Sequence, residues 1–335
     1  MGVTNDKYLF ATGRLRSLEA KVLSPTDIDR MVDAKDAEEA LKVFNDLSLA
    51  DERVDMKDAT SFEAAVMHDL GQLKDEIAGL TPDNVLLEWL FLAEDAHNVK
   101  LLLKLAKGEL VEEKYLGSFS NLALLPLEKL KILLDGKNEE VSEVYRNFIT
   151  EVLENKAKAE EAIQIDMMVD KAYTKALGAM SKIIRKDFVK KITEYRINAA
   201  NIKTSIRLKL MDKPVGVLNE AFNEGGNLKL NDVVEVYGGQ TTDLAKVLQS
   251  SIDGSLKESI SKALEEKQLS ELDKALEEYE LQLCAETTYI AYGPEIVVAY
   301  TILKQAALKN IRLIMSGKVN DIQPAEIRQY LRVKQ

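Results

Sequence analysis

Asn98-Val99-Lys100, an asparagine followed by a β-branched residue and a basic residue, is the most informative segment of the chain for its fold. The same signature occurs twice more, as Asn201-Ile202-Lys203 and Asn310-Ile311-Arg312. The three asparagines are 103 and 109 residues apart, close to one third of the 335-residue chain. Composition alone would produce such a tripeptide only about 0.3 times. The spacing therefore indicates one structural unit built three times.

The residues around each asparagine predict a long helix with one face against a core. Apolar residues take the same relative positions, i, i+3 and i+7, in all three copies, which is the period of an α-helix. They are Ala96, Val99 and Leu103; Ala199, Ile202 and Ile206; and Leu308, Ile311 and Met315. Glycine and proline signals predict that these helices end at Gly108, at Lys213-Pro214 and at Gly317.

A second pattern keeps register with the first. Apolar residues at offsets 0, +5, +8 and +9 form a box that predicts a short helix. The second and third boxes begin 27 residues after the asparagine of their copy, whereas the fourth follows Asn310 by only 12, so we expect a shortened last unit. The four boxes are Leu23/Ile28/Met31/Val32, Leu125/Leu130/Leu133/Leu134, Leu228/Val233/Val236/Tyr237 and Ile322/Ile327/Tyr330/Leu331.

The segments between these landmarks are also predicted to be helical. Helix formers and 3.6-residue spacing cover residues 36–44, 61–77, 141–176 with one break, and 255–283. Asp27 and Asp36 are typical of helix N-termini. No segment alternates like a strand. We predict an all-α protein of three similar helical-bundle domains from an internal triplication, at residues 1–112, 113–214 and 215–335.

Charge and composition narrow the classes of partner and location. The net charge of −11 argues against a nucleic-acid partner. The single cysteine, Cys284, excludes an intramolecular disulfide framework and fits a reducing compartment. No apolar run is long enough to span a bilayer, and the N-terminus lacks the apolar run of a signal peptide. We expect a cytoplasmic protein that is at most peripheral to a membrane.

The C-terminal segment departs from the acidic average. Residues 300–335 contain seven basic residues against Asp321 and Glu326. A solvated basic helix face is one interpretation, and contact with an acidic or phosphate-bearing partner is the other. Lys318, Arg328 and Arg332 are the candidate partner contacts.

Motifs for catalysis are missing. The chain has no phosphate-binding loop, no dinucleotide fingerprint and no nucleophile elbow. Its two histidines, His68 and His97, with a single cysteine make a poor zinc ligand set. We predict no catalytic, cofactor-binding or metal-binding residue. The repeated Asn98, Lys100, Asn201, Lys203, Asn310 and Arg312 are interpreted as structural positions, where each amide satisfies a backbone group and each basic residue pairs with a carboxylate. Direct contact with a partner is the alternative.

The closing stretch points to a family. Tyr292-Gly293-Pro294-Glu295, Lys309-Asn310-Ile311-Arg312 and Gly317-Lys318 resemble the C-terminal signature of the C subunit of prokaryotic A/V-type (vacuolar-type) rotary ATPases, which is similar to the d subunit of the eukaryotic vacuolar enzyme. The opening run Arg14-Leu15-Arg16 and the helix around His97-Asn98 resemble other parts of that family. One departure is that Gln305 and Ala307 replace the acidic residues expected before the last asparagine, which removes a local ion pair.

The resemblance implies a funnel of three helical domains around a pseudo-threefold axis. Such a protein would be a non-catalytic central-stalk subunit, present once per complex and peripheral on the cytoplasmic face of the membrane. It would couple the shaft subunits D and F to the membrane rotor ring of proteolipid subunits, and so transmit torque between ATP hydrolysis or synthesis and proton or sodium transport. From the residues alone, an all-helical repeat adaptor of another complex remains the alternative, while a helical enzyme would need a cofactor.

Overall fold

The protein is described by a computed structural model that covers residues 2–19, 22–47, 62–108, 118–137, 139–159, 161–252, 254, 256–267 and 269–332. Within these ranges the chain forms helices and turns and no β-strand, so the all-α prediction is confirmed. The chain divides into two compact units. The central unit comprises residues 1–2 and 85–276, and the terminal unit comprises residues 3–84 and 277–335.

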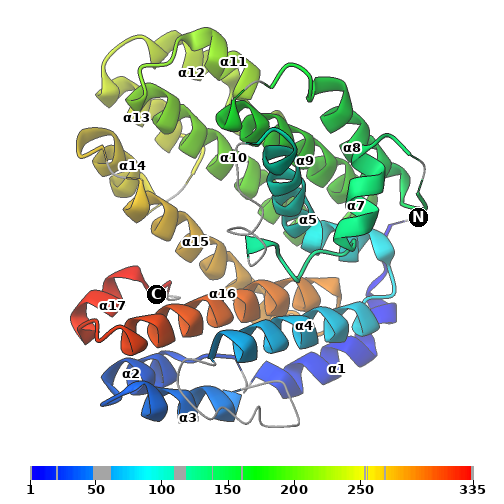
Figure 1. Cartoon of the computed structure of the whole chain (residues 1–335), viewed down its shortest axis with the longest axis vertical. Helices are drawn as coiled ribbons and strands as arrows, with labels where there is room; N and C mark the ends of the chain where they lie inside the picture. Colours follow the sequence, from blue (N-terminus) through cyan, green and yellow to red (C-terminus); the bar gives the residue numbers. More distant parts are fainter. Residues whose placement is uncertain are drawn as a thin grey trace. The chain divides into compact units, whose positions relative to one another are not determined.

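The terminal unit brings both ends of the chain together. Helix α16 packs against α1, α2, α3 and α4, and α17 packs against α2 (Figure 1). The elements of this unit are η1 (Asn5–Tyr8), α1 (Leu9–Leu18), α2 (Pro25–Asp33), α3 (Ala37–Leu47), α4 (Phe62–Leu80), η5 (Ala285–Tyr289), α16 (Pro294–Val319) and α17 (Pro324–Tyr330).

Helix α16 is the centre of this unit because it is apolar on most of its surface. Ile311, Ile314 and Met315 are completely buried and pack in one cluster with α2, α3, α4 and α17. Burial of each such side chain contributes about 1.5–3 kcal/mol to stability. The short helix α2 begins in a capping box, in which Ser24 Oγ accepts from Asp27 N and Asp27 accepts from Ser24 N.

The central unit contains the remaining helices. They are α5 (Asn84–Ala106), α7 (Leu127–Leu134), α8 (Glu143–Asn155), α9 (Ala162–Ile184), α10 (Asp187–Leu210), α11 (Val215–Ala221), α12 (Leu230–Tyr237), α13 (Thr241–Gln249), α14 (Leu256–Glu265) and α15 (Ser270–Cys284), of which the last continues into the terminal unit. Trp89 of α5 is fully buried, donates to Thr193 Oγ1 of α10 at 3.0 Å and lies 4.8 Å from the Arg196 guanidinium. These contacts fix α5 against α10.

Most of the helices predicted from the sequence are present in the structure. Each of the four apolar boxes has a short helix, namely α2, α7, α12 and α17. The predicted break in 141–176 lies between α8 and α9. Asp36 Oδ1 accepts from Glu39 N and so acts as a cap, whereas Asp27 stands three residues inside α2 as part of the capping box. No described helix is both long and apolar enough to cross a membrane.

One predicted helical segment is interrupted, and one predicted helix end was wrong. The described part of 255–283 is helical but forms two helices, because α14 ends at Glu265 and Lys267 adopts a left-handed backbone with φ of 58° before α15 begins. Gly317 does not end α16, which continues to Val319. The reason is packing: a Cβ on Gly317 would lie 2.7 Å from Ile327 Cδ1, so the glycine lets α17 approach α16.

The two compact units do not correspond one to one with the three predicted domains. The expected boundary between residues 112 and 113 lies outside the described residues. The boundary at residues 214 and 215 falls between α10 and α11, inside the central unit. The threefold division therefore stays a prediction.

Candidate functional site

The side chain of Asn98 holds the loop that follows α5. Asn98 Nδ2 donates to Ser120 O at 3.1 Å, and Asn98 Oδ1 accepts from Ser120 N at 2.8 Å. We call this pair of hydrogen bonds, between an asparagine amide and both backbone groups of one residue, an asparagine clasp. His97 beside it is exposed, with Nε2 2.9 Å from Ser118 O. The clasp satisfies backbone groups that would otherwise be left unpaired in a partly buried loop.

The other two asparagines make the same clasp. Asn201 bonds both backbone groups of Asn223 at 2.8 Å, and Asn310 bonds both backbone groups of Arg332 at 2.5 and 2.9 Å. In every case the partner is 22 residues further along the chain. The three asparagines are nearly or completely buried. The clasp is thus a repeated amide with a repeated partner at one fixed distance in sequence.

The basic residue two positions after each asparagine makes an ion pair. Lys100 pairs with Asp170 at 2.5 Å and Lys203 pairs with Asp273 at 2.6 Å, each 70 residues further on. Arg312 pairs with Glu63 at 2.5 Å. These pairs are partly exposed, so each is worth about 0–1 kcal/mol.

The ion pairs connect the helices in a regular order. Lys100 on α5 reaches α9, Lys203 on α10 reaches α15, and Arg312 on α16 reaches α4. In each case the acidic residue lies on the helix that comes before the next long helix in the chain, and α4 comes before α5. The three pairs therefore follow the same order along the chain.

A second contact accompanies the first two clasps but differs in chemistry. Three residues before Asn98, Asp95 Oδ1 accepts from Leu125 N at 3.0 Å. Three residues before Asn201, Asn198 Oδ1 accepts from Leu228 N at 3.2 Å, again 30 residues further on. The third copy has Ala307 at this position.

The three candidate C-terminal basic residues have partners within the terminal unit. Lys318 Nζ donates to Ala34 O at 2.5 Å. Arg328 binds Asp33 at 2.7 Å and Asp29 at 3.2 Å, and its hydrogen bond holds the pKa of Asp33 below the usual value. Arg332 Nε lies 3.0 Å from Glu277 Oε2. The last basic residue counted from the sequence, Lys334, lies outside the described residues.

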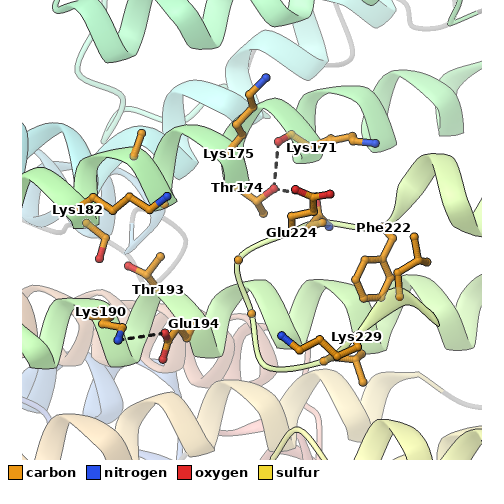
Figure 2. Close-up of a pocket in the computed structure, with 18 of the residues that line it drawn as sticks. Lys171, Thr174, Lys175, Lys182, Lys190, Thr193, Glu194, Phe222, Glu224 and Lys229 are labelled. Atoms are coloured by element: carbon orange, nitrogen blue, oxygen red, sulfur yellow. Dashed lines mark hydrogen bonds and ion pairs between the residues drawn. The ribbon is translucent and has the colours of Figure 1, made fainter. Parts of the chain in front are cut away.

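A large cleft of the central unit is rich in lysine. It has a volume of about 1310 Å³ and lies between α9, the start of α10 and the loop 222–229 between α11 and α12. We call it the lysine-lined cleft. Figure 2 shows Lys171, Lys175 and Lys182 on the α9 wall, Lys190 with Glu194 on α10, and Lys229 on the loop. The three lysines of α9 are at i, i+4 and i+11 and so share one helix face.

Part of the charge in the lysine-lined cleft is already paired. Lys175 binds Glu151 at 2.5 Å, and Lys190 lies 3.7 Å from Glu194. Lys182 and Lys229 are exposed, and neither has an ion-pair partner in the part of the chain that the structure describes. Seven basic and five acidic residues line the cleft, in a chain whose net charge is −11. The cleft is thus a locally basic surface on an acidic protein.

Among the described residues no group of three or more His, Cys, Asp or Glu side chains is placed to hold a metal ion.

The helices and contacts together define an all-α protein in which three long helices, α5, α10 and α16, carry the same clasp. This class agrees with the comparison with known families. The model of the ATP synthase (C/AC39) subunit family matches residues 11–330, so the chain belongs to this family. It is also similar to the C subunit of the A-type ATP synthase of Methanocaldococcus jannaschii, at 24% identity over 97% of this chain and 86% of the relative. The family resemblance stated from the sequence is confirmed.

Sequence reasoning missed two features of this site. Lys182 and Lys229 are far apart in sequence, and no local motif joins them. Asp95 could have been found from the sequence. Alignment of the three asparagine signatures places Asp95, Asn198 and Ala307 at one position, and Asp95 is the ionisable residue among them.

Proposed function

We propose that the chain is the non-catalytic central-stalk subunit of an A/V-type rotary ATPase. It couples the shaft subunits D and F to the membrane rotor ring, on the cytoplasmic face, and transmits torque between ATP turnover and ion transport. Family membership of residues 11–330 is the observation that carries the proposal.

The repeated contacts support a role in torque transmission. A coupling element must resist shear, and buried bidentate amide bonds resist sliding because they break when either partner shifts by a fraction of a hydrogen-bond length. The clasps of Asn98, Asn201 and Asn310 provide such bonds at three places.

We propose further that the three clasped helices belong to three repeated units around a pseudo-threefold axis, in a funnel. The common order of the ion pairs along the chain, α5 to α9, α10 to α15 and α16 to α4, supports this arrangement. The equal separation of 22 residues within each clasp supports a common origin of the units.

The electrostatic contact with an assembly partner is assigned to the lysine-lined cleft. The C-terminal basic residues Lys318, Arg328 and Arg332 already bind acceptors, whereas Lys182 and Lys229 have no ion pair among the described residues. An acidic surface of a partner would complement these two charges and speed association at low salt.

Binding of the purified chain to the isolated shaft subunits, and separately to the rotor ring, tests the proposal. The chain should bind both, and the double reversal Lys182→Glu with Lys229→Glu should weaken one of the two interactions about tenfold at low salt and less at high salt. Lys246→Glu is the matched control, because Lys246 is exposed, lies outside the cleft and pairs with Asp243 on its own helix. Binding to neither shaft nor ring would contradict the coupling role and favour an adaptor of another complex.

Charge reversal at Lys318, Arg328 and Arg332 tests the other candidate contact. If the C-terminal residues contact the partner, this triple variant weakens assembly in a salt-dependent way. The same reversal removes ion pairs to Asp29, Asp33 and Glu277, so thermal unfolding of the variant is measured alongside binding.

A further inference from the structure

The carboxylate of Asp95 is fully buried. The residue has no solvent-exposed surface, and its Oδ1 accepts a hydrogen bond from Leu125 N. Oδ2 makes no well-formed hydrogen bond among the described residues, and the same holds for the Tyr145 hydroxyl of α8, which is close enough to act on the carboxylate. Two buried polar atoms that lack a well-formed hydrogen bond are costly, because each loses water without a full replacement.

The groups that face Asp95 do not compensate a negative charge. From its own helix comes the Glu94 carboxylate, from α8 comes Tyr145, and Glu88 acts on Tyr145. The loop 118–126 contributes the backbone amides of Leu124 and Leu125. Burial raises the pKa of Asp95 to about 7, with a smaller contribution from Glu94, while the backbone amides and the Tyr145 hydroxyl lower it.

The second of the three repeated units has a neutral side chain at the position of Asp95. Asn198 occupies the position of Asp95, is also buried, and accepts from Asn227 N at 2.9 Å as well as from Leu228 N. Its Nδ2 donates to Ser251 O at 3.3 Å. The amide therefore has partners for both of its polar atoms, whereas Asp95 has one for Oδ1 alone.

We propose that Asp95 is a proton-binding site, and that the proton it takes up locks the loop 118–126 onto α5. In the protonated form, Oδ2–H donates to the Tyr145 hydroxyl oxygen and no buried charge is left, while Oδ1 keeps the bond from Leu125. In the ionised form, the buried carboxylate is repelled by Glu94, and the neutral Tyr145 hydroxyl and backbone amides replace its water only in part. Opening of the loop then lets water reach the charge.

The direction of the pH effect follows from linkage. Asp95 in the opened loop has an ordinary pKa near 3.8, whereas in the closed loop the pKa is about 7. Between these values the closed form binds more protons, so closing is favoured at the acidic end and weakens as the pH rises. Above about pH 7 Asp95 is ionised in both the closed and the opened loop, so proton binding no longer favours the closed loop. This property belongs to the chain itself and does not depend on the coupling role.

Amide hydrogen exchange of the full chain between pH 5 and pH 8 tests the proposal. The loop 118–126 is compared with the loop 222–229, which Asn198 holds in the same way and which serves as an internal control for intrinsic exchange rates. The opening equilibrium of 118–126 relative to 222–229 should rise up to about tenfold per pH unit from pH 5 to pH 7 and then level off. If this ratio does not change with pH in the wild-type protein, that result alone overturns the proposal.

Two variants sharpen the measurement. In Asp95→Asn the ratio should become independent of pH, and persistence of the dependence would assign it to another group. In Glu94→Gln the dependence should remain, with its upper limit shifted to lower pH because a neighbouring negative charge has been removed. An unshifted limit would overturn the part of the proposal in which Glu94 repels the ionised carboxylate.

Discussion

The loop 118–126, between α5 and α7, and the loop 222–229, between α11 and α12, are held by two chemical versions of the same contact. Both have an asparagine clasp across 22 residues, at Asn98 and Asn201. Three residues earlier, the first loop depends on the carboxylate Asp95 and the second on the amide Asn198. The clasp is therefore the fixed part of the unit, while the second contact can change from a neutral to an ionisable group.

The two clasps also differ in how completely they are buried. Asn201 accepts a further bond from Asn223 Nδ2 at 3.1 Å, and Asn223 is itself buried. Ser120, the partner of Asn98, is only half-buried. Water can therefore replace part of the first clasp but little of the second.

The largest effect is expected from removal of the clasp amides. Asn201→Ala should destabilise the protein by about 3 kcal/mol and Asn98→Ala by about 2 kcal/mol, since each leaves a backbone donor and acceptor unpaired. Urea unfolding followed by the fluorescence of Trp89, the single tryptophan, measures both changes in the central unit. The exposed Asn231→Ala on α12 is the control and should change stability by less than about 0.5 kcal/mol. Equal costs for Asn98 and Asn201 would remove the distinction between the clasps.

A smaller effect is expected from the glycine that lies against Asn198. A Cβ on Gly226 would overlap Asn198 Oδ1, so Gly226→Ala should displace the amide and cost about 2 kcal/mol. The first loop has Ala123 at the corresponding position, and Ala123→Gly should cost only about 0.5–1 kcal/mol through backbone entropy. Gly238→Ala, where a Cβ meets no atom within 4 Å, controls for the substitution itself. Thermal unfolding ranks the three variants, and a neutral Gly226→Ala would disprove the close approach.

The last prediction exchanges the chemistry of the two loops, and its effect at a single pH depends on that pH. Asn198→Asp should give the second loop the proton dependence of the first, since the buried carboxylate loses the bond to Ser251 O unless it is protonated. Its pKa is raised in the folded state, so the free energy of unfolding should fall by up to about 1.4 kcal/mol per pH unit as the pH rises above about 4. Urea midpoints at pH 5 and pH 8 measure this change. A pH-independent difference from wild type would show that burial alone does not produce the linkage.

The repeated parts of the fold could be predicted from the sequence because they have a local period. The buried residues Val99, Ile202 and Ile311 follow from the 3.6-residue stripe, and the four apolar boxes become α2, α7, α12 and α17. The positions of the clasp asparagines also follow from the signature. Their partners do not, because a loop residue 22 positions away has no periodic mark of its own.

The errors come from tertiary contacts that override local rules. Gly317 is a helix terminator by propensity, yet the packing of Ile327 requires it inside α16. The break before α15 occurs at Lys267, a residue type that does not indicate a left-handed backbone. The grouping of residues 3–84 with 277–335 in one compact unit depends on which helices meet in space, and helix periodicity carries no information about that.

The coupling role is tested by ATP-driven ion uptake into vesicles that contain the rotary complex, assembled with or without this chain. Without the chain, ATP hydrolysis by the soluble part should continue while ion uptake falls to background, and addition of the wild-type chain should restore uptake. Ion uptake at the full rate in complexes that lack the chain would be incompatible with a coupling role.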